Sequence, residues 1–150
     1  MVAEPACRGA PKEVRTALDT NIVSALWSSE PLASRIAADL SEAHARGGLV
    51  ICAPVYAELL AHPSATQSFV DDFLQDTGIA VDFDLDESVW RHSAKGFADY
   101  AKRRRHSGGG SPKRLLADFI VAAHALVRAD RLMTLDPSRY QRDFPELSIR

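Results

Sequence analysis

The sequence VRTALDTN, residues 14–21, contains the pattern that decides the fold. A short apolar run ends in Asp19, and Thr20 and Asn21 follow before a helical pattern begins over residues 22–27. This is typical of a buried parallel strand that ends in one acid and turns into a helix. Ligands bind beyond the carboxyl ends of strands in open α/β sheets, so Asp19 is a candidate functional residue. Asp, Thr and Asn are also common N-cap and turn residues, and that purely structural role stays open.

Outward from this stretch, strand and helix patterns alternate along the chain. The first strand is expected at residues 14–18, and further strands at 49–53, 79–83 (an edge strand), 132–135 and, as a candidate, 147–149. Helices are expected between them at residues 31–45, 54–60, 65–75, 87–105 (with Asp86 as its N-cap) and 112–128 (with Ser111 and Pro112 at its start). This alternation predicts βαβ units and an α/β fold with a mostly parallel central sheet.

Length and composition favour a single globular domain. Residues 1–13 contain two prolines and a glycine and are predicted to form a disordered tail, which leaves 14–150 as the domain. The formal net charge of -2 excludes a generally basic nucleic-acid binder, so phosphate contacts must come from local basic clusters. The two cysteines form no zinc or redox motif, and Cys52 is expected in the core. Without a signal segment or an apolar run of about 20 residues, we expect a cytoplasmic protein that does not enter the membrane.

Three further acids do not fit the pattern of surface charge. Asp118 lies in LLADFIVAAHAL, whose helix is apolar around much of its circumference and is therefore buried. Glu58 follows the second strand in APVYAELLAHP, and Asp136 ends the fourth strand in LMTLDP. Each has an ordinary alternative: a buried salt bridge or an exposed rim position for Asp118, an exposed helix face for Glu58, and an Asp-Pro turn for Asp136.

A doubly wound sheet would bring these acids and Asp19 to the same edge. Four crowded carboxylates repel one another, and a divalent cation relieves that repulsion. Oxygen ligands without His or Cys favour Mg²⁺ or Mn²⁺. The chemistry that matches such a site is metal-assisted phosphodiester hydrolysis.

In the segments that contain these acids, the sequence resembles the PIN-domain nucleases, specifically the VapC-type toxins of bacterial toxin–antitoxin pairs. The matching segments are ALDTNIVSALW, APVYAELLAHP, LLADFIVAAHAL and LMTLDPSRYQRDFPEL, which together span nearly the whole chain. The resemblance implies a PIN-like three-layer fold and a Mg²⁺- or Mn²⁺-dependent endoribonuclease. It also implies an RNA substrate, inhibition by a cognate VapB-like antitoxin, and a homodimer.

The same resemblance assigns roles to individual residues. Asp19, Glu58, Asp118 and Asp136 would hold the metal and position the attacking water. Thr20 and Asn21 would support them, and Thr134 would orient Asp136 or contact phosphate. The basic, glycine-rich segment KRRRHSGGGSPKR is longer than usual for the family, and its effect on the substrate groove stays open.

This basic segment has two interpretations. RNA phosphates would be bound by the cationic side chains of Arg103, Arg104, Arg105, Lys113 and Arg114. Alternatively, these residues only end a helix, because basic side chains favour a helix C-terminus and glycine terminates it. His124 is expected to be a core or rim histidine, and Trp27 and Trp90 are expected to be packing or dimer-interface residues.

Two other functions remain open at this stage. One is a non-catalytic PIN-like module that binds RNA or protein and whose acidic site is inactive. The presence of all four acids argues against this function. The other is a small-molecule phosphatase on a related sheet, which an assay of phosphomonoesters against structured RNA would distinguish.

Overall fold

A computed structural model describes residues 11–28, 31–109 and 114–150. The strands are β1 (Thr16–Leu18), β2 (Leu49–Cys52), β3 (Ile79–Asp82) and β4 (Arg131–Met133). The helices are α1 (Thr20–Leu26), α2 (Leu32–Arg46), α3 (Ala53–Leu60), α4 (Gln67–Thr77), α5 (Glu87–His106), α6 (Leu116–Arg128) and α7 (Pro137–Gln141). The predicted tail falls almost wholly on residues 1–10, which lie outside the described residues.

The four strands form one parallel sheet in the order β3-β2-β1-β4. The sequence prediction of a mostly parallel sheet with the 79–83 strand at its edge is therefore confirmed. β2 is buried along its whole length, as expected for an apolar run covered on both faces, and Cys52 is a free, buried core cysteine.

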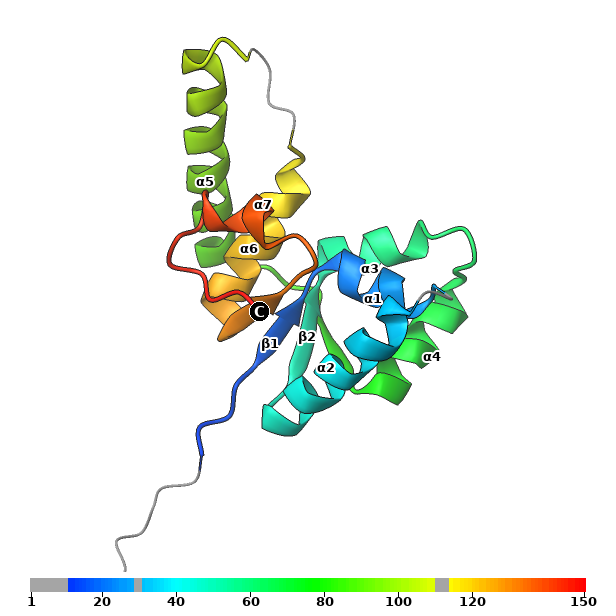
Figure 1. Cartoon of the computed structure of the whole chain (residues 1–150). Helices are drawn as coiled ribbons and strands as arrows, with labels where there is room; N and C mark the ends of the chain where they lie inside the picture. Colours follow the sequence, from blue (N-terminus) through cyan, green and yellow to red (C-terminus); the bar gives the residue numbers. More distant parts are fainter. Residues whose placement is uncertain (1–10, 29–30, 110–113) are drawn as a thin grey trace, which may run out of the picture.

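Helices cover both faces of the sheet, which gives three layers (Figure 1). α1, α2, α3 and α4 lie on one side, and α5, α6 and α7 lie on the other. From β1 the chain moves outward to β2 and β3, then crosses back to place β4 on the opposite side of β1. The strand order thus reverses between β1 and β4, and such a switch point is where α/β sheets bind ligands.

Most element boundaries differ by one or two residues from the sequence prediction, and two differences bear on the site. β4 ends at Met133 instead of residue 135, because residues 134–136 turn the chain into α7, where Pro137 is the first helical residue. α6 begins at Leu116, with Leu115 extended, although the sequence predicted a start at residue 112. The predicted cap at Ser111 and Pro112 lies outside the described residues.

The C-terminal segment adds to the sheet without forming a full strand. Ile149 makes an isolated parallel bridge with Leu132, and Arg150 N–H donates to the Leu132 carbonyl at 2.9 Å. The candidate strand at 147–149 is therefore reduced to a single bridge.

α6 is the most deeply buried helix, and residues 119–125 are all buried. His124 is 1% exposed, and its Nε2 lies 2.8 Å from Asp82 Oδ2, so the prediction of a core histidine is confirmed. α5 packs along α6, and Gly96 of α5 lies against the rings of Phe119 and Phe144. A Cβ at this position would lie 2.8 Å from Cζ of Phe144 and 3.3 Å from Cδ1 of Phe119, so only glycine fits without displacing these rings.

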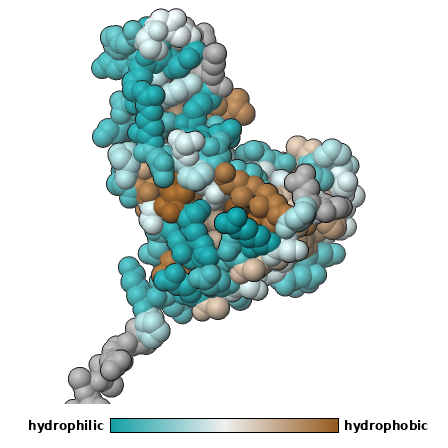
Figure 2. Space-filling model, viewed as in Figure 1, coloured by the Kyte–Doolittle hydropathy of each residue, from teal (hydrophilic) through white to brown (hydrophobic). Residues whose placement is uncertain are grey.

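The surface along α5 is mostly hydrophilic (Figure 2). Trp27 packs edge-on against His62, Phe69 and Phe73, which favours the packing role, whereas Trp90 is 48% exposed. None of the helices in the described parts of the chain is long and apolar enough to cross a bilayer.

Candidate acidic site at the carboxyl edge of the sheet

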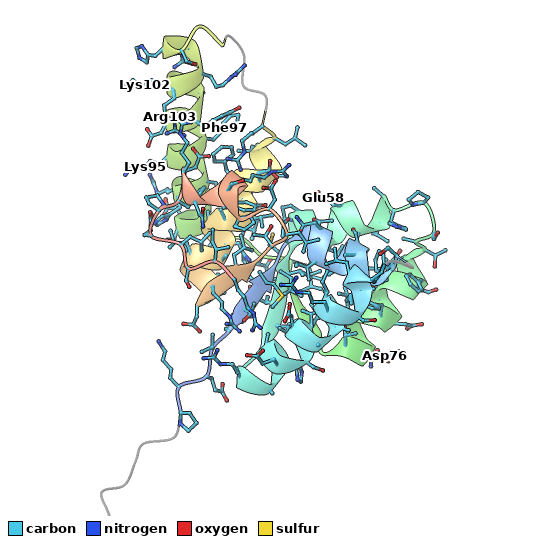
Figure 3. All side chains as sticks on the ribbon, in the orientation of Figure 1. Glu58, Asp76, Lys95, Phe97, Lys102 and Arg103 are labelled. Carbon is cyan, nitrogen blue, oxygen red and sulfur yellow. The ribbon has the colours of Figure 1, made fainter. Side chains whose placement is uncertain are left out.

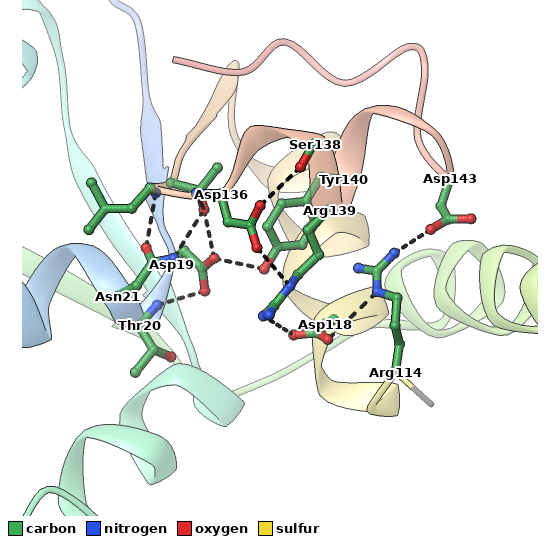
Figure 4. Close-up of polar contacts among 12 residues, drawn as sticks. Asp19, Thr20, Asn21, Arg114, Asp118, Asp136, Ser138, Arg139, Tyr140 and Asp143 are labelled. Atoms are coloured by element: carbon green, nitrogen blue, oxygen red, sulfur yellow. Dashed lines mark hydrogen bonds and ion pairs between the residues drawn. The ribbon is translucent and has the colours of Figure 1, made fainter. Parts of the chain in front are cut away.

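Asp19 stands at the end of β1 and is held by three hydrogen bonds (Figure 4). Its Oδ1 accepts from the Thr20 backbone N–H at 2.8 Å and so caps α1. Its Oδ2 accepts from the Thr134 hydroxyl at 2.9 Å and from the Tyr140 hydroxyl at 2.8 Å. Asp19 is only 7% exposed, and these donors compensate the buried charge and fix its orientation.

Thr134 and Asn21 connect the ends of β1 and β4. The Thr134 hydroxyl oxygen accepts from the Asp136 backbone N–H at 3.1 Å, while its own proton goes to Asp19. The Asn21 side chain accepts from Leu135 N–H at 3.2 Å and donates to Thr134 Oγ1 at 3.4 Å. These contacts place Asp136 beside Asp19, although Asp136 stands at the N-cap position of α7, without a capping hydrogen bond from its side chain, instead of ending a strand.

Asp118 lies in the first turn of α6, with its side chain 20% exposed. Burial raises the pKa of its carboxyl; Arg139 and Arg114 oppose this rise, and the charges of Asp19 and Asp136 add to it. Asp118 is therefore close enough to both of these acids to feel their charge.

Glu58 lies on α3 and is exposed (Figure 3). Burial of part of the side chain raises the pKa of its carboxyl, and the charges of Asp19 and Asp118 raise it further. Thr20 and Arg139 act in the opposite direction. The four predicted acids thus share one electrostatic environment instead of lying on separate faces.

Two residues that sequence reasoning missed complete this site. Arg139 pairs with Asp118 (Nη1 to Oδ1, 3.6 Å) and with Asp136 (Nε to Oδ2, 3.3 Å), and Tyr140 is the buried donor to Asp19. Both lie on α7, three and four residues after Asp136. Residues at that spacing lie on one face of a helix, and this spacing from Asp136 is the sequence signal that points to both residues.

The predicted basic residues divide between a pocket and the open surface. Arg103, Arg104 and Arg114 line a pocket of about 380 Å³, and Arg105 is exposed and not among its lining residues. Lys113 lies outside the described residues. We call this the arginine pocket; its other lining residues are Tyr100, Ser107, Ser138, Arg139, Arg142 and Asp143. Asp143, 4% exposed at its side chain, forms ion pairs with Arg103 and Arg114.

The sequence profile of the PIN domain matches residues 16–145, which include all four acids. The chain belongs to the PIN domain family. No curated protein matches this PIN domain closely enough to inform its function.

Solved structures similar to this PIN domain include three bacterial assemblies. For VapBC2 from Rickettsia felis bound to a promoter DNA fragment, the TM-score is 0.64 at 19% identity, with 91% of this chain and 97% of that chain covered. For VapBC-1 from nontypeable Haemophilus influenzae, the TM-score is 0.61 at 22% identity, with 91% of this chain and 96% of that chain covered. For FitAcB from Neisseria gonorrhoeae, the TM-score is 0.61 at 21% identity, with 89% of this chain and 95% of that chain covered. At these identities the likeness shows the fold.

The donor set of this PIN domain suits a hard divalent cation. Its acids offer only oxygen ligands, and the buried Thr20 hydroxyl makes no hydrogen bond of ordinary geometry within the described residues. Burial and the neighbouring carboxylates raise the pKa values of Glu58 and Asp118, although Arg139 lowers both. In the described residues, however, no three His, Cys, Asp or Glu side chains are grouped closely enough to hold one ion as they stand. Arg139 supplies positive charge to two of the acids instead.

Proposed function

We propose that this PIN domain is a Mg²⁺- or Mn²⁺-dependent endoribonuclease and the toxin of a type II toxin–antitoxin system. The observation that supports this most directly is the position of Asp19, Asp118 and Asp136. Asp118 lies near enough to Asp19 and Asp136 for their charges to raise its pKa, and hydrogen bonds from Tyr140 and Thr134 orient the Asp19 carboxylate at the end of β1. Phosphodiester hydrolysis is the chemistry that a carboxylate-rich edge of this kind performs with a metal.

Asp19, Glu58, Asp118 and Asp136 are the residues that would hold the metal. When bound, the cation would polarise the scissile phosphate and lower the pKa of a coordinated water. The protein's own contribution is orientation: Thr134 and Tyr140 keep Asp19 in one rotamer, and Asn21 keeps Thr134 in place. Glu58 is exposed, so its carboxylate can also position the attacking water that enters from solvent.

The partners follow from the same proposal. The similar structures are VapBC assemblies and FitAcB, which supports a VapB-like antitoxin as the partner of this chain. RNA is the proposed substrate, and a homodimer is the proposed active form.

The test is RNA cleavage with Mn²⁺ and with a chelator. Asp118→Asn and Asp19→Asn should each lower the cleavage rate by about 100-fold or more, because loss of a metal ligand costs more than loss of a supporting residue. Asp76→Asn, an exposed acid on α4 well separated from Glu58 (Figure 3), is the control and should retain full activity. Cleavage that is equal in all variants, or that persists in the chelator, would contradict the proposal.

One observation favours a second candidate, a PIN-like module that binds RNA or protein without cleaving it. Arg139 already pairs with Asp118 and Asp136, as a resident counter-ion would in a silent site. This candidate predicts RNA or partner binding with no cleavage under any metal condition.

A further inference from the structure

The arginine pocket lies directly beside the acidic site. Arg139 lines the pocket and pairs with Asp118 and Asp136, and Arg114 lines it and approaches Asp118 (Nε to Oδ2, 3.8 Å). Ser138, another lining residue, donates its hydroxyl to Asp136 at 3.1 Å. Because the two sites share these side chains, they adjoin one another.

The pocket is built for an anion. Five arginines line it, and the one carboxylate among its lining residues is Asp143. Asp143 is used structurally, because it is buried and pairs with Arg103 of α5 and with Arg114, just before α6. It therefore fixes two guanidinium groups at the wall of the pocket. Arg142 is exposed and forms no ion pair within the described residues, so its charge is available to a ligand.

We propose that the arginine pocket binds the RNA backbone phosphate next to the phosphodiester bond that is held at the acidic site. This rests on the proposed ribonuclease function. Guanidinium groups match phosphate oxygens in geometry as well as in charge, whereas the acidic site by itself would repel an RNA strand. The pocket thus supplies the attraction that places a polyanion against carboxylates, and cleavage requires a phosphate on the pocket side of the cut bond.

The experiment measures binding of a short single-stranded RNA to the full chain in a chelator, across a series of salt concentrations. Arg142→Gln should weaken binding about fivefold to tenfold, and Arg142→Glu should weaken it further. The slope of log affinity against log salt should fall by about 0.7, the value for one lost phosphate contact on a single strand. Lys102→Gln is the matched control: it removes an exposed charge from α5 outside the pocket and should leave affinity and slope nearly unchanged.

Equal effects of Arg142→Gln and Lys102→Gln would overturn the proposal, because RNA would then sense only the general field of the surface. In cleavage assays, Arg142→Gln should raise KM and leave kcat unchanged, as expected for a contact made equally in the ground and transition states. If the wild-type chain cleaves RNA but Arg142→Gln has an unchanged KM, the pocket proposal fails and the ribonuclease proposal stands. If no cleavage occurs but the binding loss is specific to Arg142, the pocket proposal stands and the ribonuclease proposal fails.

Discussion

Asp19 serves two purposes that its sequence pattern left as alternatives. One carboxylate oxygen caps α1, and the other accepts from Thr134 and Tyr140. The two roles are compatible because they use different oxygens. The cap also helps the site, since it removes the rotational freedom of a side chain that would otherwise have to be ordered when a ligand binds.

Tyr140→Phe tests the hydrogen bond that fixes Asp19. Phe fits the same space, but the fully buried hydroxyl and its bond to Asp19 are lost. Because this bond has a charged acceptor, we expect the free energy of unfolding to fall by about 1.5–3 kcal/mol and RNA cleavage to slow. Chemical denaturation and the cleavage assay measure the two effects.

Tyr56→Phe is the matched control for this prediction. Tyr56 also donates its hydroxyl to an aspartate, Asp71, at 2.7 Å, but this bond lies in solvent. Its loss should cost clearly less stability and no cleavage activity. Equal losses in the two variants would mean that the Tyr140 bond gains nothing from burial.

Individual residues could be predicted from the sequence only where a pattern isolated them. Asp19, Glu58, Asp118 and Asp136 stood out because each is an acid at the end of a strand or on an apolar helix. Arg139 and Tyr140 did not stand out, because SRYQ after an Asp-Pro turn has the composition of an ordinary surface segment. Their roles come from the short helix α7, which places them over the sheet edge.

The pair His124 and Asp82 joins α6 to the edge strand β3, and it makes stability depend on pH. Burial lowers the pKa of His124 below its ordinary value of 6.5, although Asp82 opposes this effect; Arg15 and Arg128 lower it further. Below pH 6.5 the His124 side chain takes up a proton more readily in the unfolded chain than in the folded chain. The free energy of unfolding should therefore fall between about pH 7 and pH 5.

Denaturant titrations across this range measure the effect. In His124→Gln the decline should be shallower, because the side chain that titrates differently in the two states is gone. An identical pH profile in the variant would assign the decline to other groups.

The two ion pairs of Asp143 join α5, through Arg103, to Arg114 in the segment before α6. Asp143→Asn would leave Arg103 and Arg114 without their shared carboxylate. A fully buried broken pair costs about 3–5 kcal/mol, and we expect a smaller loss here because Arg103 is 39% exposed. Thermal unfolding measures the loss, and Arg91→Gln, which breaks an exposed pair with Glu87, should have almost no effect.

At the element scale, the sequence predicted the order and type of every strand and helix from β1 to β4, because apolar periodicity reports burial. The exceptions lie where tertiary contacts decide the boundary. β4 stops at Met133 because the Thr134 side chain bonds to Asp19 and to the Asp136 N–H. Arg114, just before α6, is held by the Tyr100 hydroxyl and by Asp143. Neither partner is near in sequence.

For the whole molecule, divalent metal should stabilise the fold at neutral pH. Burial and neighbouring carboxylates raise the pKa of Asp118 and Glu58 above the ordinary values of 3.8 and 4.5. Stability from these groups is fully present below those values and is lost as pH rises through the folded-state pKa values. A bound cation offsets that loss, so Mn²⁺ should raise the melting temperature at pH 7, and the rise should continue as the Mn²⁺ concentration increases above its Kd.

Melting temperatures measured with Mn²⁺ at a pH near the ordinary pKa values of Asp118 and Glu58 provide the control. There the acids hold protons, so Mn²⁺ should have little effect, and in Asp118→Asn the response should be weak at either pH. A rise in melting temperature that is unchanged in Asp118→Asn would place the cation elsewhere on the molecule.

The missing side chain at Gly96 has a consequence for the arginine pocket. Phe144, which occupies the space above Gly96, is the immediate neighbour of Asp143 in the chain. An added methyl group would push that ring outward and carry the adjacent carboxylate with it, together with the two arginines that it grips. The positions of two arginines in the pocket therefore depend on the absence of a side chain at residue 96 of α5.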